Sequence, residues 1–135
     1  MHFSFPQKVL FRHCDPAGIV FFPRYAEMVN DAVEAMFSER LGWPFQDIHP
    51  VGGVPTASIA LQFKAPSRHG DRLSLDISLQ RIGATSLTME TVARCRGEVR
   101  FVAEQTIVNV DGQGRPQSWP DTVRGTVERI MEERA

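Results

Sequence analysis

The sequence predicts an α+β domain in which a five-stranded antiparallel sheet wraps around one long helix, with a second helix at the C-terminus. Two observations predict this fold. One long stretch has the apolar spacing of a helix, and five other segments alternate apolar and polar residues, as strands do. Most connections between these strands are too short for parallel crossovers, which need about a dozen residues or more. The 135 residues fit one domain, spanning residues 1–135.

The composition excludes several classes of protein. Fifteen Lys and Arg residues stand against 16 Asp and Glu residues, so the formal net charge is −1 and the surplus of cations typical of nucleic-acid binding is missing. The hydrophobic fraction of 42% is ordinary for a globular domain. No apolar run approaches the roughly 20 residues of a membrane span, and the first residues do not resemble a secretory signal. We therefore expect a cytoplasmic protein without membrane or nucleic-acid partners.

The first predicted strand covers residues 3–11, where apolar residues alternate with polar ones. Pro6 indicates an edge strand or a bulge, because proline lacks the N–H that a central strand needs. Asp15, Pro16 and Gly18 then occupy the positions that these residue types prefer in a type I turn. The strand is therefore expected to end before this turn.

The long helix is predicted over residues 23–41. Pro23 suits a first helical turn, where its missing N–H would have no partner, and Gly42 is typical of a helix end. Such a helix is about 28 Å long. Its apolar residues follow the i, i+3, i+4 spacing of one face: Tyr25, Met28, Val29, Ala32, Val33, Met36, Phe37 and Leu41. A stripe of this length needs a large apolar surface to pack on.

Residues 43–55 are predicted to form a loop, because they contain three prolines and a Gly-Gly pair. Alternation then predicts strands at residues 57–65, 73–79, 87–95 and 99–110, which we expect to form an antiparallel meander. Ser118 and Asp121 resemble a capping box that opens a C-terminal helix. Its inward residues are predicted to be Val123, Val127, Ile130 and Met131. A sheet that wraps around one helix is the hotdog arrangement.

The segment RHCDPAGIVFFPRY, residues 12–25, carries the chemistry. It places the Asp15 carboxylate in a tight turn, followed by four large apolar residues and then by the start of the long helix. N–H groups at a helix start have no internal acceptor and lie at the positive end of the helix dipole, so they can bind developing negative charge. The apolar run would form a dry wall for a substrate, and Asp15 would face the same space.

At these residues the chain resembles the 4-hydroxybenzoyl-CoA thioesterase family, whose members have the hotdog fold and carry the signature D-x-D-P-x-G-I-V-[aromatic]-x-P-x-Y. The matching residues are Asp15, Pro16, Gly18, Ile19, Val20, Phe21, Pro23 and Tyr25. The chain departs from the signature at the first Asp, where it has His13. Weaker matches follow at residues 63–66, 70–71, 81–83 and 86.

The resemblance implies a hydrolase that cleaves an aromatic or short-chain acyl-CoA to free acid and CoA. It implies that Asp15 is the catalytic carboxylate and that the Phe22 backbone N–H polarises the thioester carbonyl. We expect coenzyme A to be part of the substrate and no further cofactor to be required. The residues expected to contact the acyl group or CoA are Gly18, Ile19, Val20, Tyr25, Arg81, Thr85 and Ser86.

Several alternatives remain open from the residues. Asp15 could act as nucleophile, through an acyl-enzyme anhydride, or as general base toward water. The same pocket could serve a non-catalytic module that binds acyl-CoA or an acyl carrier. A hotdog dehydratase or hydratase would need a poised histidine, and His13 does not stand in the sequence context of those enzymes. His13 and Cys14 are not expected to form a catalytic pair, because successive strand residues point to opposite faces.

Neither a metal nor a serine nucleophile is predicted. The four histidines lack zinc-ligand spacing, and the chain has no G-x-S-x-G motif. A single curled sheet leaves an exposed edge, which predicts at least a homodimer with sheets joined edge to edge. The resemblance extends this expectation to a homotetramer.

Overall fold

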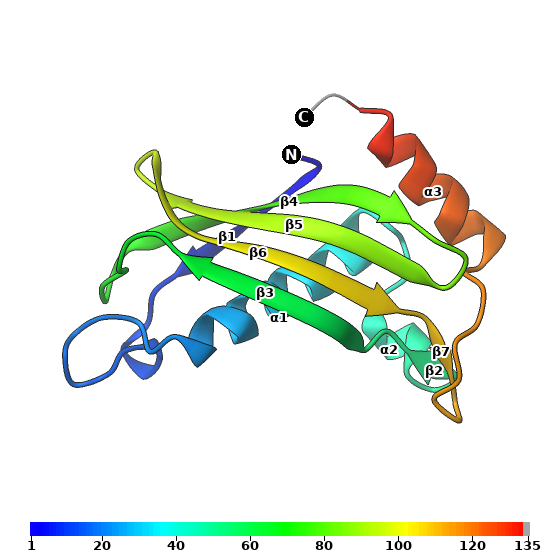
Figure 1. The fold of residues 1–135 in the computed structure, drawn as a ribbon, viewed down its shortest axis with the longest axis horizontal. Helices are drawn as coiled ribbons and strands as arrows, with labels where there is room; N and C mark the ends of the chain where they lie inside the picture. Colours follow the sequence, from blue (N-terminus) through cyan, green and yellow to red (C-terminus); the bar gives the residue numbers. More distant parts are fainter. Residues whose placement is uncertain (134–135) are drawn as a thin grey trace.

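The computed structural model describes residues 1–133 and contains one curved five-stranded sheet (Figure 1). The strand order is β1-β4-β5-β6-β3, and every neighbouring pair is antiparallel. The strands are β1 (Phe3–Lys8), β3 (Thr56–Phe63), β4 (Arg72–Ile82), β5 (Ser86–Cys95) and β6 (Glu98–Val108). The order makes β1 an edge strand, as Pro6 predicted.

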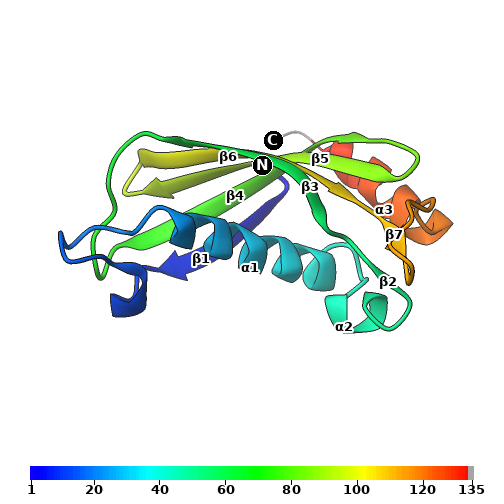
Figure 2. The ribbon, with the colours of Figure 1, turned by 60° about the horizontal axis from the view of Figure 1, so that its bottom comes forward.

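Helix α1 (Pro23–Glu39) lies against the concave face of this sheet (Figure 2). Its apolar stripe is buried as predicted, from Tyr25 through Met28 to Phe37. Inward residues of β4, β5 and β6, including Leu75, Met89 and Phe101, complete one continuous core. The hotdog fold predicted from the sequence is confirmed.

The predicted meander of four strands is wrong in one respect, because β3 pairs with β6 and not with β4. The connection over residues 64–71 instead crosses the end of the sheet. The Lys64 and Ala65 N–H groups both donate to the carbonyl oxygen of Arg100, which holds the crossing in place. Strand β3 thus forms the second edge, and its apolar side chains remain exposed, with 41% of Ile59 and 51% of Phe63 accessible.

Several boundaries differ from the sequence prediction. Strand β1 ends at Lys8, and the 3₁₀ turn η1 (Phe11–His13) follows it. The predicted loop contains the short helix α2 (Phe45–Ile48) and the strand β2 (Gly52–Gly53). Strand β2 pairs with β7 (Val110–Asp111). Strand β7 follows β6 in the sequence and is separated from it by Asn109.

The predicted capping box is also wrong. Helix α3 (Asp121–Met131) begins after Pro120, and no side chain caps it. The segment before it is held otherwise, because the Ser118 carbonyl oxygen accepts a bond from Asn109 Nδ2 and the Trp119 indole donates to the Ser86 carbonyl oxygen. Three of the four residues predicted to point inward are buried, and Met131 is half-buried. No helix among residues 1–133 has the length and hydropathy of a membrane span.

Candidate active site at the start of the long helix

Asp15 begins the tight turn that its sequence predicts. Its carbonyl oxygen accepts the Gly18 N–H at 2.9 Å, and Oδ1 of its side chain accepts the Ala17 N–H at 2.9 Å. Gly18 has a φ of 82°, a left-handed conformation that glycine adopts at no steric cost. The second carboxylate oxygen, Oδ2, forms no hydrogen bond within residues 1–133. The Asp15 residue as a whole is half-buried.

The Asp15 turn is joined to its surroundings by three backbone hydrogen bonds. The Asp15 N–H donates to the Ile19 carbonyl oxygen, and the Phe21 N–H donates to that of His13. The Val20 N–H donates at 2.9 Å to the carbonyl oxygen of Ser67, in the connection that crosses the sheet end. The turn is therefore fixed both to itself and to residues 64–71.

The Phe22 N–H is the donor at this helix start that remains free. The Arg24 and Tyr25 N–H groups are already bonded to the carbonyl oxygens of Phe21 and Phe22, at 2.9 and 3.1 Å, and Pro23 has no N–H. Within residues 1–133 no acceptor contacts the Phe22 N–H. The first turn of α1 carries no acidic residue, so its positive dipole end is not neutralised there.

A cavity of about 300 Å³ lies beside this helix start. Ile19, Val20, Phe22 and Tyr25 line one side, and residues 63–66 line the other. The Tyr25 ring packs against the ring of Phe101 with centroids 4.4 Å apart. The structure thus brings four predicted site residues together around one largely apolar space. Gly18 and Asp15 lie in the adjoining turn and do not line this cavity.

His13 and Cys14 do not form a catalytic pair, although the reason differs from the predicted one. The two residues lie at the end of a 3₁₀ turn, not in a strand. The buried His13 ring accepts the Leu10 N–H at Nδ1, and burial, followed by the charge of Arg12, lowers the pKa of His13. The Cys14 Sγ contacts the Leu10 carbonyl oxygen at 3.7 Å. His13 is therefore a neutral structural residue.

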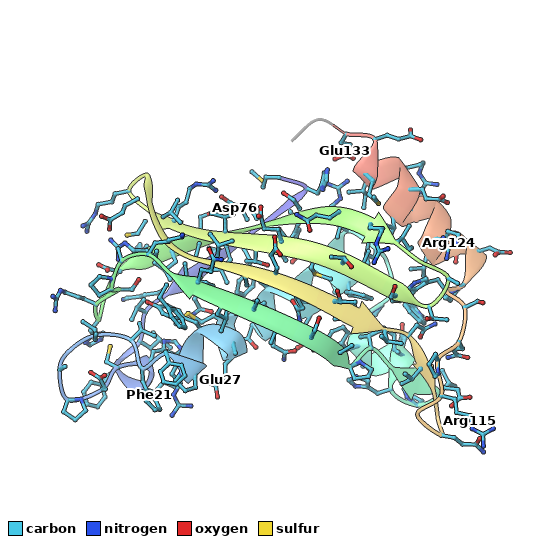
Figure 3. All side chains as sticks on the ribbon, viewed as in Figure 1. Phe21, Glu27, Asp76, Arg115, Arg124 and Glu133 are labelled. Atoms are coloured by element: carbon cyan, nitrogen blue, oxygen red, sulfur yellow. The ribbon has the colours of Figure 1, made fainter. Side chains whose placement is uncertain are left out.

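Arg81, Thr85 and Ser86 lie at the opposite end of the sheet from the Asp15 turn. They surround the β4–β5 turn, where the Arg124 guanidinium donates to the Gly83 carbonyl oxygen. Figure 3 shows Phe21 at one end of the molecule and Arg124 at the other. Within one chain, these three predicted CoA contacts are therefore not brought together with Asp15.

The ion pair between Arg100 and Asp71, which the sequence analysis missed, stabilises the connection that holds the Asp15 turn. Arg100 Nη1 lies 2.7 Å from Asp71 Oδ2, and the same nitrogen contacts Ser67 Oγ at 3.2 Å. A hydrogen bond from the Arg68 N–H, followed by the one from Arg100, lowers the pKa of Asp71. The available signal was Arg100, an arginine at a buried position of a strand with alternating residues. Its partner Asp71 lies 29 residues away in the sequence, so no local pattern identifies the pair.

A second cavity, of about 630 Å³, lies between α1, α2 and the start of β3. Gln105 of β6 lines it at a position where the alternation of that strand predicts an apolar residue. The polar residue in an inward position is a signal that the sequence analysis did not use. Among residues 1–133, no group of three or more His, Cys, Asp and Glu side chains is placed to hold a metal ion.

Comparison with known proteins identifies relatives over nearly the whole chain. The model of the thioesterase-like superfamily matches residues 9–127. A 1,4-dihydroxy-2-naphthoyl-CoA hydrolase from Synechocystis is 31% identical over 85 residues, which cover 61% of this chain. The match spans 60% of the length of that relative.

Solved structures share the fold. A gentisyl-coenzyme A thioesterase is 27% identical, with a TM-score of 0.84 over 90% of this chain and 98% of its own. A 1,4-dihydroxy-2-naphthoyl-CoA thioesterase from Synechocystis superposes with a TM-score of 0.88 at 18% identity, covering 97% and 98% of the two chains. A thioesterase from Thermus thermophilus, complexed with coenzyme A and zinc, gives 0.85 at 22% identity, covering 98% and 97%.

Proposed function

Because this chain belongs to the thioesterase-like superfamily, we propose that it hydrolyses acyl-CoA thioesters, with Asp15 as catalytic carboxylate and the Phe22 N–H as oxyanion donor. The relatives named above are thioesterases or CoA hydrolases, which supports the reaction class. The observation that carries the assignment of residues is the free Phe22 N–H beside an apolar cavity and next to the Asp15 turn.

The Phe22 N–H has the properties that thioester hydrolysis requires. Attack on a thioester carbonyl develops negative charge on its oxygen, and a preorganised donor stabilises that charge by about 3 kcal/mol. A donor already bonded to protein would have to break that bond first. The Phe22 N–H has no such bond, and the dipole of α1 adds to its positive potential.

Asp15 supplies the second requirement, an anionic group with a free oxygen. As a nucleophile, Oδ2 would bond to the carbonyl carbon, the C–S bond would break and CoA would leave as thiolate; water would then hydrolyse the anhydride. As a general base, the carboxylate would take a proton from water while the water oxygen attacks. Both routes use the same residue and neither requires a cofactor.

Two copies of the chain are proposed to join along β3. This strand has a free edge and exposed apolar side chains, which are features that pairing with a second copy would cover. Antiparallel pairing about the middle of β3 sets Thr56 of one copy across from Phe63 of the partner subunit. A homodimer built this way could pair again to form a tetramer.

The substitution Asp15→Asn tests the carboxylate. Asparagine keeps an oxygen for the Ala17 N–H, so the turn and the fold should persist, whereas kcat for acyl-CoA should fall at least about a hundredfold. Free-thiol release across a panel of aromatic and short-chain acyl-CoAs measures the turnover, and calorimetry measures binding. Binding should persist in the variant. Unchanged hydrolysis by folded Asp15→Asn would remove Asp15 from the mechanism.

Asp111→Asn is a matched control. The Asp111 carbonyl oxygen accepts the Gly114 N–H at 2.9 Å, and its Oδ1 accepts the Gln113 N–H at 2.9 Å, so this turn repeats the geometry of the Asp15 turn away from the proposed site. The control variant should keep full turnover. A wild-type protein that binds acyl-CoA or an acyl carrier without any turnover would instead be a binding module.

A further inference from the structure

We propose that Gln105 selects the acyl group, by binding a hydrogen-bond donor such as a ring hydroxyl in the cavity between α1 and the start of β3. This inference rests on the proposed thioesterase function and concerns the part of the substrate that the Asp15 turn does not touch. It assigns a role to a second cavity, at about 630 Å³ the size of a small-molecule site.

The amide of Gln105 is buried and only half satisfied. The residue is 6% exposed, and its Nε2 donates to Thr56 Oγ1 at 2.9 Å. Its Oε1 has no hydrogen-bond partner among residues 1–133. A buried acceptor without a partner lowers stability unless a ligand or water supplies the donor. The unpaired atom therefore points to a ligand that donates.

The rest of the lining suits an aromatic or aliphatic acyl group. Val33 and Ile107 of this lining are buried, and Phe45 is half-buried. Five other polar side chains line the cavity and all are exposed, so Gln105 is the buried polar side chain of this lining within residues 1–133: Asn30, Glu34, Gln46, His49 and Thr56. The cavity thus combines buried apolar side chains with one buried acceptor, an arrangement that can select a ligand with a hydroxyl group.

The proposed dimer connects this cavity to the catalytic turn. In one chain the two sites lie along different turns of α1, since Phe22 precedes the helix and Val33 follows about three turns later, roughly 16 Å along the axis. Edge pairing of β3 brings the Thr56 end of one copy beside the Phe63 end of the partner subunit. Thr56 and Gln105 would then border the cavity that contains the free Phe22 N–H of the other copy.

Steady-state kinetics with matched acyl groups test the role of Gln105. The probes are benzoyl-CoA, 3-hydroxybenzoyl-CoA, 4-hydroxybenzoyl-CoA and 4-methoxybenzoyl-CoA, because a methoxy group accepts but does not donate. The wild-type protein should favour at least one hydroxylated probe over benzoyl-CoA and the methoxy probe by tenfold or more in kcat/KM. Gln105→Leu should reduce that ratio at least tenfold.

Two further variants keep the test decisive. Thr56→Val removes the hydroxyl group that accepts the hydrogen bond from the Gln105 amide. Because Thr56 is exposed, the variant should fold normally, and it should lower the same ratio. Gln80→Leu changes an exposed glutamine of β4 and should leave the ratio intact. Binding of the same probes to Asp15→Asn, by calorimetry, measures the hydroxyl preference without turnover. No preference for a hydroxylated probe, or one that survives both Gln105→Leu and Thr56→Val, overturns the inference and leaves the thioesterase function standing. Absence of all turnover refutes the thioesterase function instead.

Discussion

At the residue scale, the Phe22 N–H differs from its neighbours because all the other backbone donors at this helix start are hydrogen-bonded within the protein. Phe21 donates to His13, while Arg24 and Tyr25 donate back to Phe21 and Phe22. Pro23 contributes no N–H and holds the first turn in a helical conformation. One unbonded donor is therefore left at the positive end of α1, beside the cavity.

Replacing Phe22 by proline removes this donor without breaking a hydrogen bond within residues 1–133. The φ of Phe22 is −53°, close to the value that proline imposes. If the N–H stabilises an oxyanion, Phe22→Pro should lower kcat by about a hundredfold or more relative to Phe22→Ala, which loses the same ring but keeps the N–H. Thermal unfolding of both variants checks the fold. Equal kcat in the two variants would exclude the donor role.

Two elements that are distant in sequence form the support of the site. The connection at residues 64–71 is fixed to β6 through Arg100, which bonds Asp71, the Ser67 hydroxyl and the Pro66 carbonyl oxygen. The connection in turn accepts the Val20 N–H. The position of the Asp15 turn thus depends on a largely buried ion pair, with 9% of the Arg100 side chain and 16% of the Asp71 side chain exposed.

This support makes the stability dependent on pH in a defined direction. The pKa of Asp71 is lower in the folded protein than its unfolded value of about 3.9, so the unfolded chain takes up the proton first. The stabilising contribution is complete above the unfolded pKa and is lost as the pH falls through the folded pKa. Asp71→Asn should therefore lower the Tm at pH 7, by an amount that shrinks below about pH 4.

Thermal unfolding of the wild-type protein and Asp71→Asn between pH 7 and pH 3 measures this difference. At pH 7 the loss should be of the order of 2 kcal/mol, as for a hydrogen bond to a charged partner. Asp47→Asn, which changes an exposed carboxylate in the first turn of α2, is the control and should lower the Tm at pH 7 by much less than Asp71→Asn. A Tm difference that stays constant down to pH 3 would contradict the ion-pair interpretation.

At the scale of the whole molecule, the free edge of β3 is the feature that favours pairing with a second copy. Strand β3 is exposed along nearly its whole length, whereas β4, β5 and β6 bury every second residue. The free Phe22 N–H and the Gln105 cavity both lie near this strand, at its two ends. A second copy paired along β3 would cover the apolar side chains and bring the two sites together.

Light scattering at micromolar concentration should therefore give the mass of a dimer or a tetramer. Ile59→Lys places a charge in the middle of β3, at a side chain that is 41% exposed in one chain, so the monomer should fold while the assembly weakens. Its turnover should fall together with its mass. Val51→Lys, at a 65% exposed position outside β3, is the control. A monomeric wild-type protein would contradict both the dimer and the composite site.

The sequence by itself determined α1, α3, the five strands of the large sheet and the Asp15 turn, because all of these depend on local spacing. The apolar stripe of α1, the alternation of the strands and the Asp-Pro-x-Gly turn each lie within a few residues of chain. Local spacing also explains why the capping box predicted at Ser118 is wrong. Hydrogen bonds between residues distant in sequence, from Asn109 to Ser118 and from Trp119 to Ser86, determine the conformation of the segment before α3.

Only the tertiary structure decided which elements lie side by side. Alternation of apolar and polar residues does not encode strand order. The sequence therefore placed β3 beside β4, whereas in the structure β3 lies at the far edge of the sheet, where its apolar residues are exposed. The bond of Val20 to Ser67, the Arg100–Asp71 pair and the half-satisfied amide of Gln105 all join residues at least 29 positions apart. These contacts depend on the crossing of the connection over the sheet end and on the pairing of β3 with β6, which no local pattern specifies.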